Sequence, residues 1–325
     1  MRRRAMLLAG LAAPVGKAAF AQPRWPDRPI RLVVPFVAGS STDTIARVVA
    51  AKLSEMLGER MVVDNRAGAG GLIAAQTVAR AAPDGTTLFF GGSTLIGNAS
   101  LHREPGYDPV ADFTPIVSIV ENPALLVVRA DAPWPDTASL AAAMRERAAA
   151  GRPLSYGSGG VGTPAHLAAA ALSTLARAEA LHVPYRGANQ AVLALAQGEV
   201  DFTYAIIGIA LPQVRGGAFR PLMVTGARRA SSLPDVPTFG EAIPGGPVVT
   251  TWSSLAGPAG VPASVQRVLH EAVHRAAQDA GFIQALTRDG GEMVLSESPE
   301  SFARFWRDQR QVLSELVRMT GARVE

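Results

Sequence analysis

Apolar strand-like runs alternate with helix-like segments along almost the whole chain, and this alternation restricts the fold more than any other feature. Residues 30–36 form an apolar run bordered by proline, as expected for a strand buried on both faces. Apolar residues then recur at helical spacing over residues 45–57, and similar pairs continue as far as an amphipathic segment at 300–319. The alternation predicts an α/β protein with mostly parallel sheets flanked by helices.

The chain contains no low-complexity linker, so two domains would have to be joined without a flexible tether. The expected crossings are near Asn122 and Pro123 and in the extended segment 248–252. Residues 116–120 and 125–129, on either side of the first crossing, are predicted as strands. The predicted organisation has residues 22–123 together with 246–325 as one domain and residues 124–245 as the other.

Residues 1–21 have the features of a signal peptide. Three arginines precede a short apolar stretch, and Ala19-Phe20-Ala21 is an A-x-A cleavage site, which predicts cleavage after Ala21 and export to the periplasm. The alternative is a disordered N-terminal tail. Cysteine is absent, which excludes disulfides, cysteine-based metal sites and a lipid-modified cysteine.

The charge balance argues against a nucleic-acid-binding function for the body of the protein, with a local basic patch as the alternative. Of the 31 basic residues, Arg2, Arg3, Arg4 and Lys17 lie in residues 1–21, and the remaining 27 equal the 27 acidic residues. Nucleic acids and anionic membranes require a surplus of positive charge, which the predicted mature chain lacks.

A glycine-rich segment that starts at Gly157 and ends at Gly162 matches G-x-G-x-x-G between a predicted strand and a predicted helix. Such a turn can hold a dinucleotide pyrophosphate, with an acidic residue further on that binds the ribose. Glu179 lies near that distance but precedes the next strand instead of ending it. The sequence favours a turn that presents N–H groups to a smaller anion, with a dinucleotide-dependent oxidoreductase as an alternative.

His270, Glu271 and His274 match H-E-x-x-H, the motif of zinc peptidases. Residues 265, 268, 269, 272, 273 and 276 form one apolar helical stripe, and the histidines lie on the opposite side. The wheel therefore favours a solvated helix face, with an exported zinc peptidase as the second alternative. Glu292 is the conceivable third ligand.

Three short loops rich in Gly, Ser and Thr each follow a predicted strand and open a helix, at residues 39–43, 91–94 and 157–163. A helix N-terminus has unpaired N–H groups and a partial positive charge, so it binds carboxylate or phosphate without Lys or Arg. In doubly wound sheets the ligand lies at the carboxyl ends of the strands. The three loops together predict an anion-binding site and no cofactor or metal.

Several segments, in order along the chain, carry a family resemblance. They include PIRLVVPF at 29–36, VDNRAGAGG at 63–71, HVPYRG at 182–187, LPDVPTF at 233–239 and GPAGVP at 257–262. Taken together they resemble the substrate-binding proteins of tripartite tricarboxylate transporters, the Bug type. The resemblance covers almost the whole predicted mature chain.

The resemblance implies a two-domain, Venus-flytrap periplasmic receptor, and not an enzyme. It implies a monomer that captures a small organic carboxylate and delivers it to membrane subunits of a transporter or to a sensor protein. It carries a ligand-binding role onto Phe36, Ser40, Ser41, Thr42, Asp43, Ser93, Thr94, Gly157, Ser158, Gly162, Thr163, His166, Tyr204 and Ala205. Within this set, Asp43 is expected to order the start of a helix, and a packed helix position is favoured for His166.

Ala205 and Ile206 stand where polar residues are common in the family. The far end of the ligand site is therefore expected to be apolar. This favours a monocarboxylate, or an acid with an apolar or aromatic tail, over a citrate-like tricarboxylate.

Overall fold

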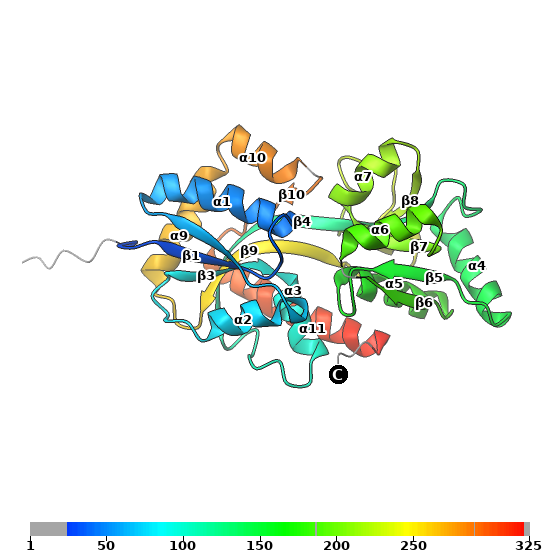
Figure 1. Ribbon diagram of the computed structural model, residues 1–325, viewed down its shortest axis with the longest axis horizontal. Helices are drawn as coiled ribbons and strands as arrows, with labels where there is room; N and C mark the ends of the chain where they lie inside the picture. The colour runs from blue at the N-terminus through cyan, green and yellow to red at the C-terminus, as the bar shows by residue number, and fades with distance from the viewer. Residues whose placement is uncertain (1–24, 186, 289, 322–325) are drawn as a thin grey trace, which may run out of the picture.

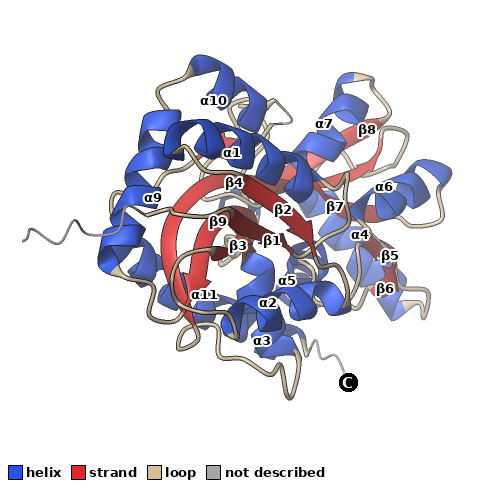
Figure 2. Ribbon diagram, turned by 60° about the vertical axis from the view of Figure 1, so that its left-hand side comes forward, coloured by secondary structure: helices blue, strands red, loops and turns tan. Residues whose placement is uncertain are grey.

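The computed structural model describes residues 25–321 apart from residues 186 and 289. The predicted signal peptide, residues 1–21, lies outside the described residues. Within them, ten strands form one curled sheet, and helices cover both of its faces (Figures 1 and 2). The strand order is β2-β1-β3-β9-β4-β7-β5-β6, with β8 and β10 each paired to β4 outside this path.

The first lobe, on the left of Figure 1, is built from both ends of the described chain. Its strands are β1 (Ile30–Val34), β2 (Met61–Asn65), β3 (Thr87–Gly92), the first part of β4 (Phe113–Arg129), β9 (Thr250–Pro258) and β10 (Glu292–Met293). Its helices are α1 (Ser41–Leu57), η1 (Ala69–Gly71), α2 (Leu72–Ala79), α3 (Ser93–Leu101), α9 (Ala263–Ala276), α10 (Ala280–Thr287) and α11 (Pro299–Thr320).

The second lobe is formed by the middle of the chain. Its strands are the rest of β4, β5 (Ser155–Ser158), β6 (Leu181–Pro184), β7 (Phe202–Ile206) and β8 (Phe219–Val224). Its helices are α4 (Thr137–Ala149), α5 (Pro164–Ala176), α6 (Ala188–Gln197), α7 (Ile207–Arg215) and α8 (Phe239–Ala242).

Each central strand supplies apolar side chains to both faces of the sheet. Leu32 and Val34 of β1 are buried in the cluster under α1, α9 and α10, whereas Val33 between them is buried with α2, α3 and α11. Leu88, Phe89 and Phe90 of β3 divide between the two faces in the same way. Alternate side chains of a strand point to opposite faces, so a continuous apolar run places a core on each side.

Strand β4 carries the chain from the first lobe into the second. Its residues up to Pro123 pair with β9, and those from Ala124 onward pair with β7 and β8. The segment that returns the chain to the first lobe lies beside β4, because Val249 N donates to Thr225 O and Thr225 N donates to Ala124 O. The two segments thus run side by side.

The strand directions bring two sets of loops together. In the first lobe β1, β2 and β3 are parallel, and β4 runs the same way because β9 is antiparallel to both β3 and β4. In the second lobe β5, β6 and β7 are mutually parallel and run against β4. The carboxyl ends of β1 and β3 therefore face the carboxyl ends of β5, β6 and β7. Every strand pair outside these two parallel sets includes β4 or β9.

Helix α11 packs against both lobes. It contacts α3 and β4 of the first lobe and α5 of the second. One apolar cluster includes Phe302 and Trp306 of α11, Leu95 of α3 and Leu172 of α5. The core on this face is consequently continuous from one lobe to the other.

Candidate functional site

The facing strand ends meet between the lobes. A Cβ placed on Gly162, in the loop after β5, would overlap Leu101 at the end of α3. A Cβ on Gly290 would lie 3.2 Å from Ile207 Cγ2 at the start of α7. Loops of the first lobe are thus in contact with loops of the second, and the helix starts at these strand ends are the candidate site.

Four helices at these strand ends begin without a side-chain cap. They are α2, α3, α6 and α7, whose N-cap residues are Gly71, Gly92, Gly187 and Ile206. Two of these helices belong to each lobe. Where the first N–H groups of a helix have no partner, they and the partial positive charge beside them can bind a carboxylate. Some of these groups are already used, since Leu72 N of α2 donates to Ala69 O and Gln190 N of α6 donates to Gly187 O. Helix α9 also lacks a side-chain cap, but it begins at the far end of the first lobe.

The first predicted anion loop is largely occupied by its own structure. Ser40 caps α1 by accepting a hydrogen bond from Asp43 N at 3.2 Å. The buried carboxylate of Asp43 accepts from Gly39 N at 2.8 Å, Arg47 Nε at 2.9 Å and Asn65 Nδ2 at 2.9 Å. Asp43 orders the start of the helix, as the sequence predicts.

The surroundings of Asp43 keep it ionised. Burial alone would raise the pKa of Asp43, but the hydrogen bonds from Arg47, Gly39 and Asn65 outweigh it and hold the pKa below its ordinary value. Asn65 also donates to Phe36 O at 3.0 Å, so one amide connects the ends of β1 and β2. Sequence analysis assigned no role to Asn65 or Arg47, although Asn65 lies in a family motif.

The remaining residues of this loop are at most partly buried. Phe36 and Thr42 are half-buried, and Ser41 is exposed at the first position of α1. The neighbouring Val37 has 65% of its surface exposed. The loop thus presents hydroxyls and an apolar edge that its own hydrogen bonds do not use.

The second predicted loop is the start of α3. The Trp252 ring lies against Gly92, where a Cβ would overlap it, and it supports the backbone turn from β3 into the helix. Ser93 is 5% exposed, and no hydrogen bond of its hydroxyl is found among the described residues. Thr94 lies beside Gly71, so the starts of α2 and α3 are neighbours.

The third predicted loop is held by a stack of rings. The His182 ring contacts both Tyr156 and His166, with ring centroids 4.9 and 4.1 Å away, and the centroids of Tyr156 and His166 are 6.3 Å apart. Its Nε2 is 2.7 Å from the Oγ of Ser158, which also accepts from Gly160 N and donates to Gly160 O. The hydroxyl hydrogen of Ser158 is directed to Gly160 O, so Ser158 Oγ accepts the hydrogen bond from His182 Nε2. His182 is therefore the tautomer that carries its hydrogen on Nε2.

His166 completes this loop from α5. Gly162 N donates to His166 Nδ1 at 3.0 Å, and Thr163 caps the helix by accepting from His166 N. Burial lowers the pKa of His166, and burial together with the charge of His166 lowers the pKa of His182 to about 4. Both imidazoles are therefore neutral at pH 7. The sequence gives no sign of this role of His182, because its partner Ser158 lies on the neighbouring strand β5.

Three predicted residues lie inside the second lobe. Gly157 is buried in β5, and its carbonyl accepts from Thr203 Oγ1 at 2.8 Å. Tyr204 and Ala205 are buried in β7, where Tyr204 stacks on Phe239 and its Oη has no partner among the described residues. The open helix start begins one residue later, at Ile206.

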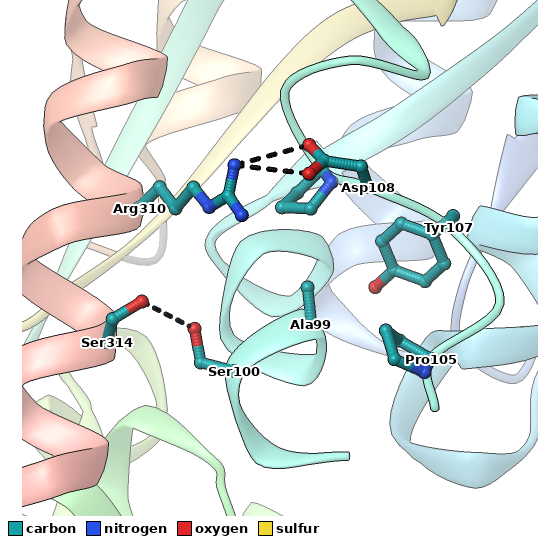
Figure 3. Close-up of a pocket in the computed structure, with 8 residues that line it drawn as sticks. Ala99, Ser100, Pro105, Tyr107, Asp108, Arg310 and Ser314 are labelled. Atoms are coloured by element: carbon teal, nitrogen blue, oxygen red, sulfur yellow. Dashed lines mark hydrogen bonds and ion pairs between the residues drawn. The ribbon is translucent and has the colours of Figure 1, made fainter. Parts of the chain in front are cut away.

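The cavity shown in Figure 3 lies elsewhere, beside α11, with a volume of about 320 Å³. Arg310 pairs with Asp108 there at 3.2 Å, Ser100 hydrogen-bonds Ser314, and the buried Tyr107 hydroxyl donates to Leu95 O. These polar groups satisfy one another, and the cavity adjoins the end of α3 rather than its uncapped start. It is not the candidate site.

Comparison with known proteins identifies the family. The family described as "Tripartite tricarboxylate transporter family receptor" matches residues 45–321. The chain belongs to this receptor family. Two relatives of the receptor span nearly its whole length. A UPF0065 protein in the tcbD-tcbE intergenic region of Pseudomonas sp. (strain P51) is 36% identical over 97% of this chain and 94% of that protein. Protein BugT of Bordetella pertussis is 31% identical over 98% and 95%.

Solved structures agree with this assignment. R. palustris Rpa4515 with adipate matches the receptor with a TM-score of 0.81 and 34% identity, over 92% of this chain and all of that one. MatC from Rhodopseudomonas palustris with bound malate gives 0.78 and 32%, over 90% and 100%. The periplasmic binding protein BugD gives 0.79 and 30%, over 93% and 100%. The predicted family, the two-domain α/β fold and the prediction of a receptor instead of an enzyme are confirmed.

The two enzyme-like motifs have structural roles in the receptor. The G-x-G-x-x-G segment folds into the loop held by Ser158 and His166. His270 and His274 are not on a solvated face as the helical wheel predicts: both are half-buried, and each Nε2 lies 3.0 Å from Ser296 O. The wheel could not show this, because the segment before α11 folds back over α9. The described residues contain no group of three or more His, Cys, Asp or Glu side chains placed to hold a metal ion.

No helix within the described residues is both long enough and apolar enough to cross a membrane.

Proposed function

We propose that the receptor is periplasmic, captures a small organic carboxylate between its lobes and delivers it to the membrane subunits of a tripartite tricarboxylate transporter. The observation that carries the proposal is the set of four uncapped helix starts, two from each lobe, at facing strand ends. Membership of the receptor family and the adipate and malate bound to its neighbours support it.

In this proposal a ligand carboxylate accepts hydrogen bonds from the N–H groups at the start of α3, with Ser93 and Thr94 as hydroxyl donors. The starts of α6 and α7 bind the other end of the ligand. Four other residues act on ligand binding indirectly, because their hydrogen bonds hold the loops in shape. They are Ser40, Asp43, Thr163 and His166. The outer edge of the site is formed by Phe36, Ser41 and Thr42. The backbone of the facing loop is formed by Gly157, Ser158 and Gly162.

We also propose that the two lobes move as domains, residues 22–123 with 246–325 against residues 124–245. The change of partners along β4 after Pro123 supports a hinge there, next to the return crossing at Val249. Ligand that bridges both lobes would favour the closed arrangement, since it gains contacts only when the lobes approach.

The test is a thermal-shift panel with adipate, malate, citrate, hexanoate and benzoate, followed by native mass spectrometry of the protein as purified. We expect a clear rise in Tm with at least one small carboxylate and none with a neutral amide analogue. Preferential stabilisation by hexanoate or benzoate would support the expected apolar far end, whereas preference for citrate would contradict it. No shift with any acid would overturn the proposed function.

Variants distinguish ligand contacts from loop structure. S93A should weaken binding of the most stabilising acid and leave the free energy of unfolding without ligand within about 0.5 kcal/mol. S40A should instead lower that free energy by about 1 kcal/mol, because it removes the cap of α1. Equal binding by S93A and the wild-type protein would contradict the placement of the ligand at α3.

A further inference from the structure

The loop between β2 and α2, residues 66–71, includes η1 and belongs to the family motif at residues 63–71, but it has no role so far in the proposed carboxylate site. It lies where the parallel strands of the first lobe end. A Cβ placed on Gly71 would lie 2.9 Å from Pro35 Cβ, just after β1, and 3.5 Å from Thr94 Cγ2 in α3. The loop is therefore beside the start of α3, where the carboxylate is proposed to bind.

The backbone of this loop has an uncommon conformation. Four consecutive residues, 68–71, have positive φ angles, and one of them, Ala69 at φ 45°, is not glycine. Such a residue costs free energy, so it persists only where the surrounding structure fixes it. Within the described residues, Asn98 of α3 is the one side chain that hydrogen-bonds to residues 67–71, and its Nδ2 donates to Gly70 O at 2.8 Å.

Peptide geometry shows where the free N–H groups of the loop point. Gly68 O accepts from Gly71 N. Ala69 O accepts from Leu72 N, so both carbonyls are turned into the loop. In a trans peptide the N–H points opposite to the carbonyl of the preceding residue, so the N–H groups of Ala69 and Gly70 point out of the loop. Both residues are exposed, and no partner of either N–H is found in the described part of the chain.

A buried hydroxyl at the start of α3 also lacks a partner. Ser93 is 5% exposed, and no hydrogen bond of its hydroxyl is found within the residues that the structure describes. A buried polar group of this kind costs free energy unless a ligand or a water molecule pairs with it. The start of α3 and the neighbouring loop thus both present donors that the fold itself does not use.

We propose that Asn98 is a positioning residue of the carboxylate site, which holds the loop so that the N–H groups of Ala69 and Gly70 add to the donors at the start of α3. The inference rests on the proposed function. One oxygen of the ligand carboxylate accepts from the start of α3, and the other accepts from the two loop N–H groups, since adjacent N–H groups in a turn form a concave anion site. Asn98, which is 8% exposed, does not touch the ligand.

The experiment compares N98A with Q76A, using the acid that most stabilises the wild-type protein. Gln76 is the matched control, because its Nε2 also donates to a backbone carbonyl, Pro105 O, at 2.8 Å, but from the middle of α2. N98A should weaken acid binding, measured by calorimetry, on the order of tenfold or more, because hydrogen bonds to an ionised group are strong. Q76A should bind the acid as tightly as the wild-type protein. Both variants lose one hydrogen bond, so both should have a lower Tm without ligand.

Amide NMR spectra separate positioning from a general loss of structure. In the wild-type protein the acid should shift the amide signals of Ala69, Gly70 and residues 93–95. In N98A it should shift only those of residues 93–95. N98D keeps the size of the side chain but cannot donate when ionised, so it should give the same pattern and serves if N98A does not fold.

The outcomes distinguish this inference from the proposed function. Equal acid affinity of N98A and the wild-type protein, or loop signals that still shift in N98A, would overturn the role of Asn98 and leave the proposed function intact. Equal weakening by Q76A would also overturn it, because a general loss of stability would then explain both variants. No acid binding to the wild-type protein would overturn the proposed function itself.

Discussion

At the scale of single residues, Asp43 shows how a charged group can belong to a ligand loop without contacting the ligand. Its carboxylate accepts three hydrogen bonds from three different segments and is almost fully buried. A buried carboxylate of this kind stabilises the fold only while all its partners are present, because each donor left unpaired costs free energy.

D43N should therefore lower the free energy of unfolding by about 2–3 kcal/mol at pH 7, because its amide N–H₂ would face another donor. The lowered pKa of Asp43 means that its stabilisation is present above the pKa of the unfolded chain and is lost as the pH falls through the folded pKa. Urea unfolding at several pH values measures both effects. S41A, an exposed change in the same turn, serves as the control, and equal stability of D43N and S41A would contradict the argument.

The ring stack around His182 makes the free energy of unfolding depend on pH over a second range. Between about pH 4 and the ordinary histidine pKa of 6.5, the unfolded chain binds a proton at His182 that the folded chain does not. Stability should consequently fall as the pH decreases through this range, by about 1–2 kcal/mol for a partly exposed group. H182Q keeps a donor for Ser158 and should flatten the stability curve over this window. An unchanged slope would show that His182 is not responsible.

At the scale of elements, the turn from β3 into α3 depends on Gly92 because of space. The Trp252 ring occupies the place that a Cβ on Gly92 would take. G92A should cost about 1–3 kcal/mol by overpacking. The cost should be smaller in a W252F background, as a double-mutant cycle by urea unfolding would show. Additive costs would contradict direct contact.

Hydrophobic periodicity predicted most elements, because their packing repeats the local pattern. The helices at 164–176 and 188–197 and the strand that begins at Ile30 lie where periodicity places them. Prediction failed where tertiary pairing overrides local preference. Pro123 separates two predicted strands, yet β9 pairs with the residues up to it and β7 and β8 pair with those after it, so both form one strand, β4. Helix α7 was not predicted, since Pro212 lies inside it.

The candidate site was less predictable than the fold. The sequence indicates which loops follow strands, but not which hydroxyls already accept a hydrogen bond from the helix start that they cap. Ser40 and Thr163 cap their helices, whereas the start of α3 has no cap, and these three positions look alike in the sequence. Contacts between distant segments, such as Asn65 with Asp43 and His182 with Ser158, depend on strand order, which periodicity does not give.

At the scale of the whole molecule, the shared core beneath α11 should couple the lobes during unfolding. One apolar cluster extends from α3 through α11 to α5, so neither lobe can lose its structure without exposing part of the other. Differential scanning calorimetry should show a single transition with equal calorimetric and van't Hoff enthalpies. Two resolved transitions in the wild-type protein would contradict this coupling.

The place of β9 between β3 and β4 also has a consequence for biosynthesis. The first lobe needs β9, a strand that the ribosome makes about 160 residues after β3, whereas every strand of the second lobe precedes β9 in the chain. The middle of the chain can therefore gain structure while the beginning still waits for its central strand. During this interval the edges of β3 and β4 that later pair with β9 remain unpaired. A chaperone that binds incompletely folded chains would have to protect these edges.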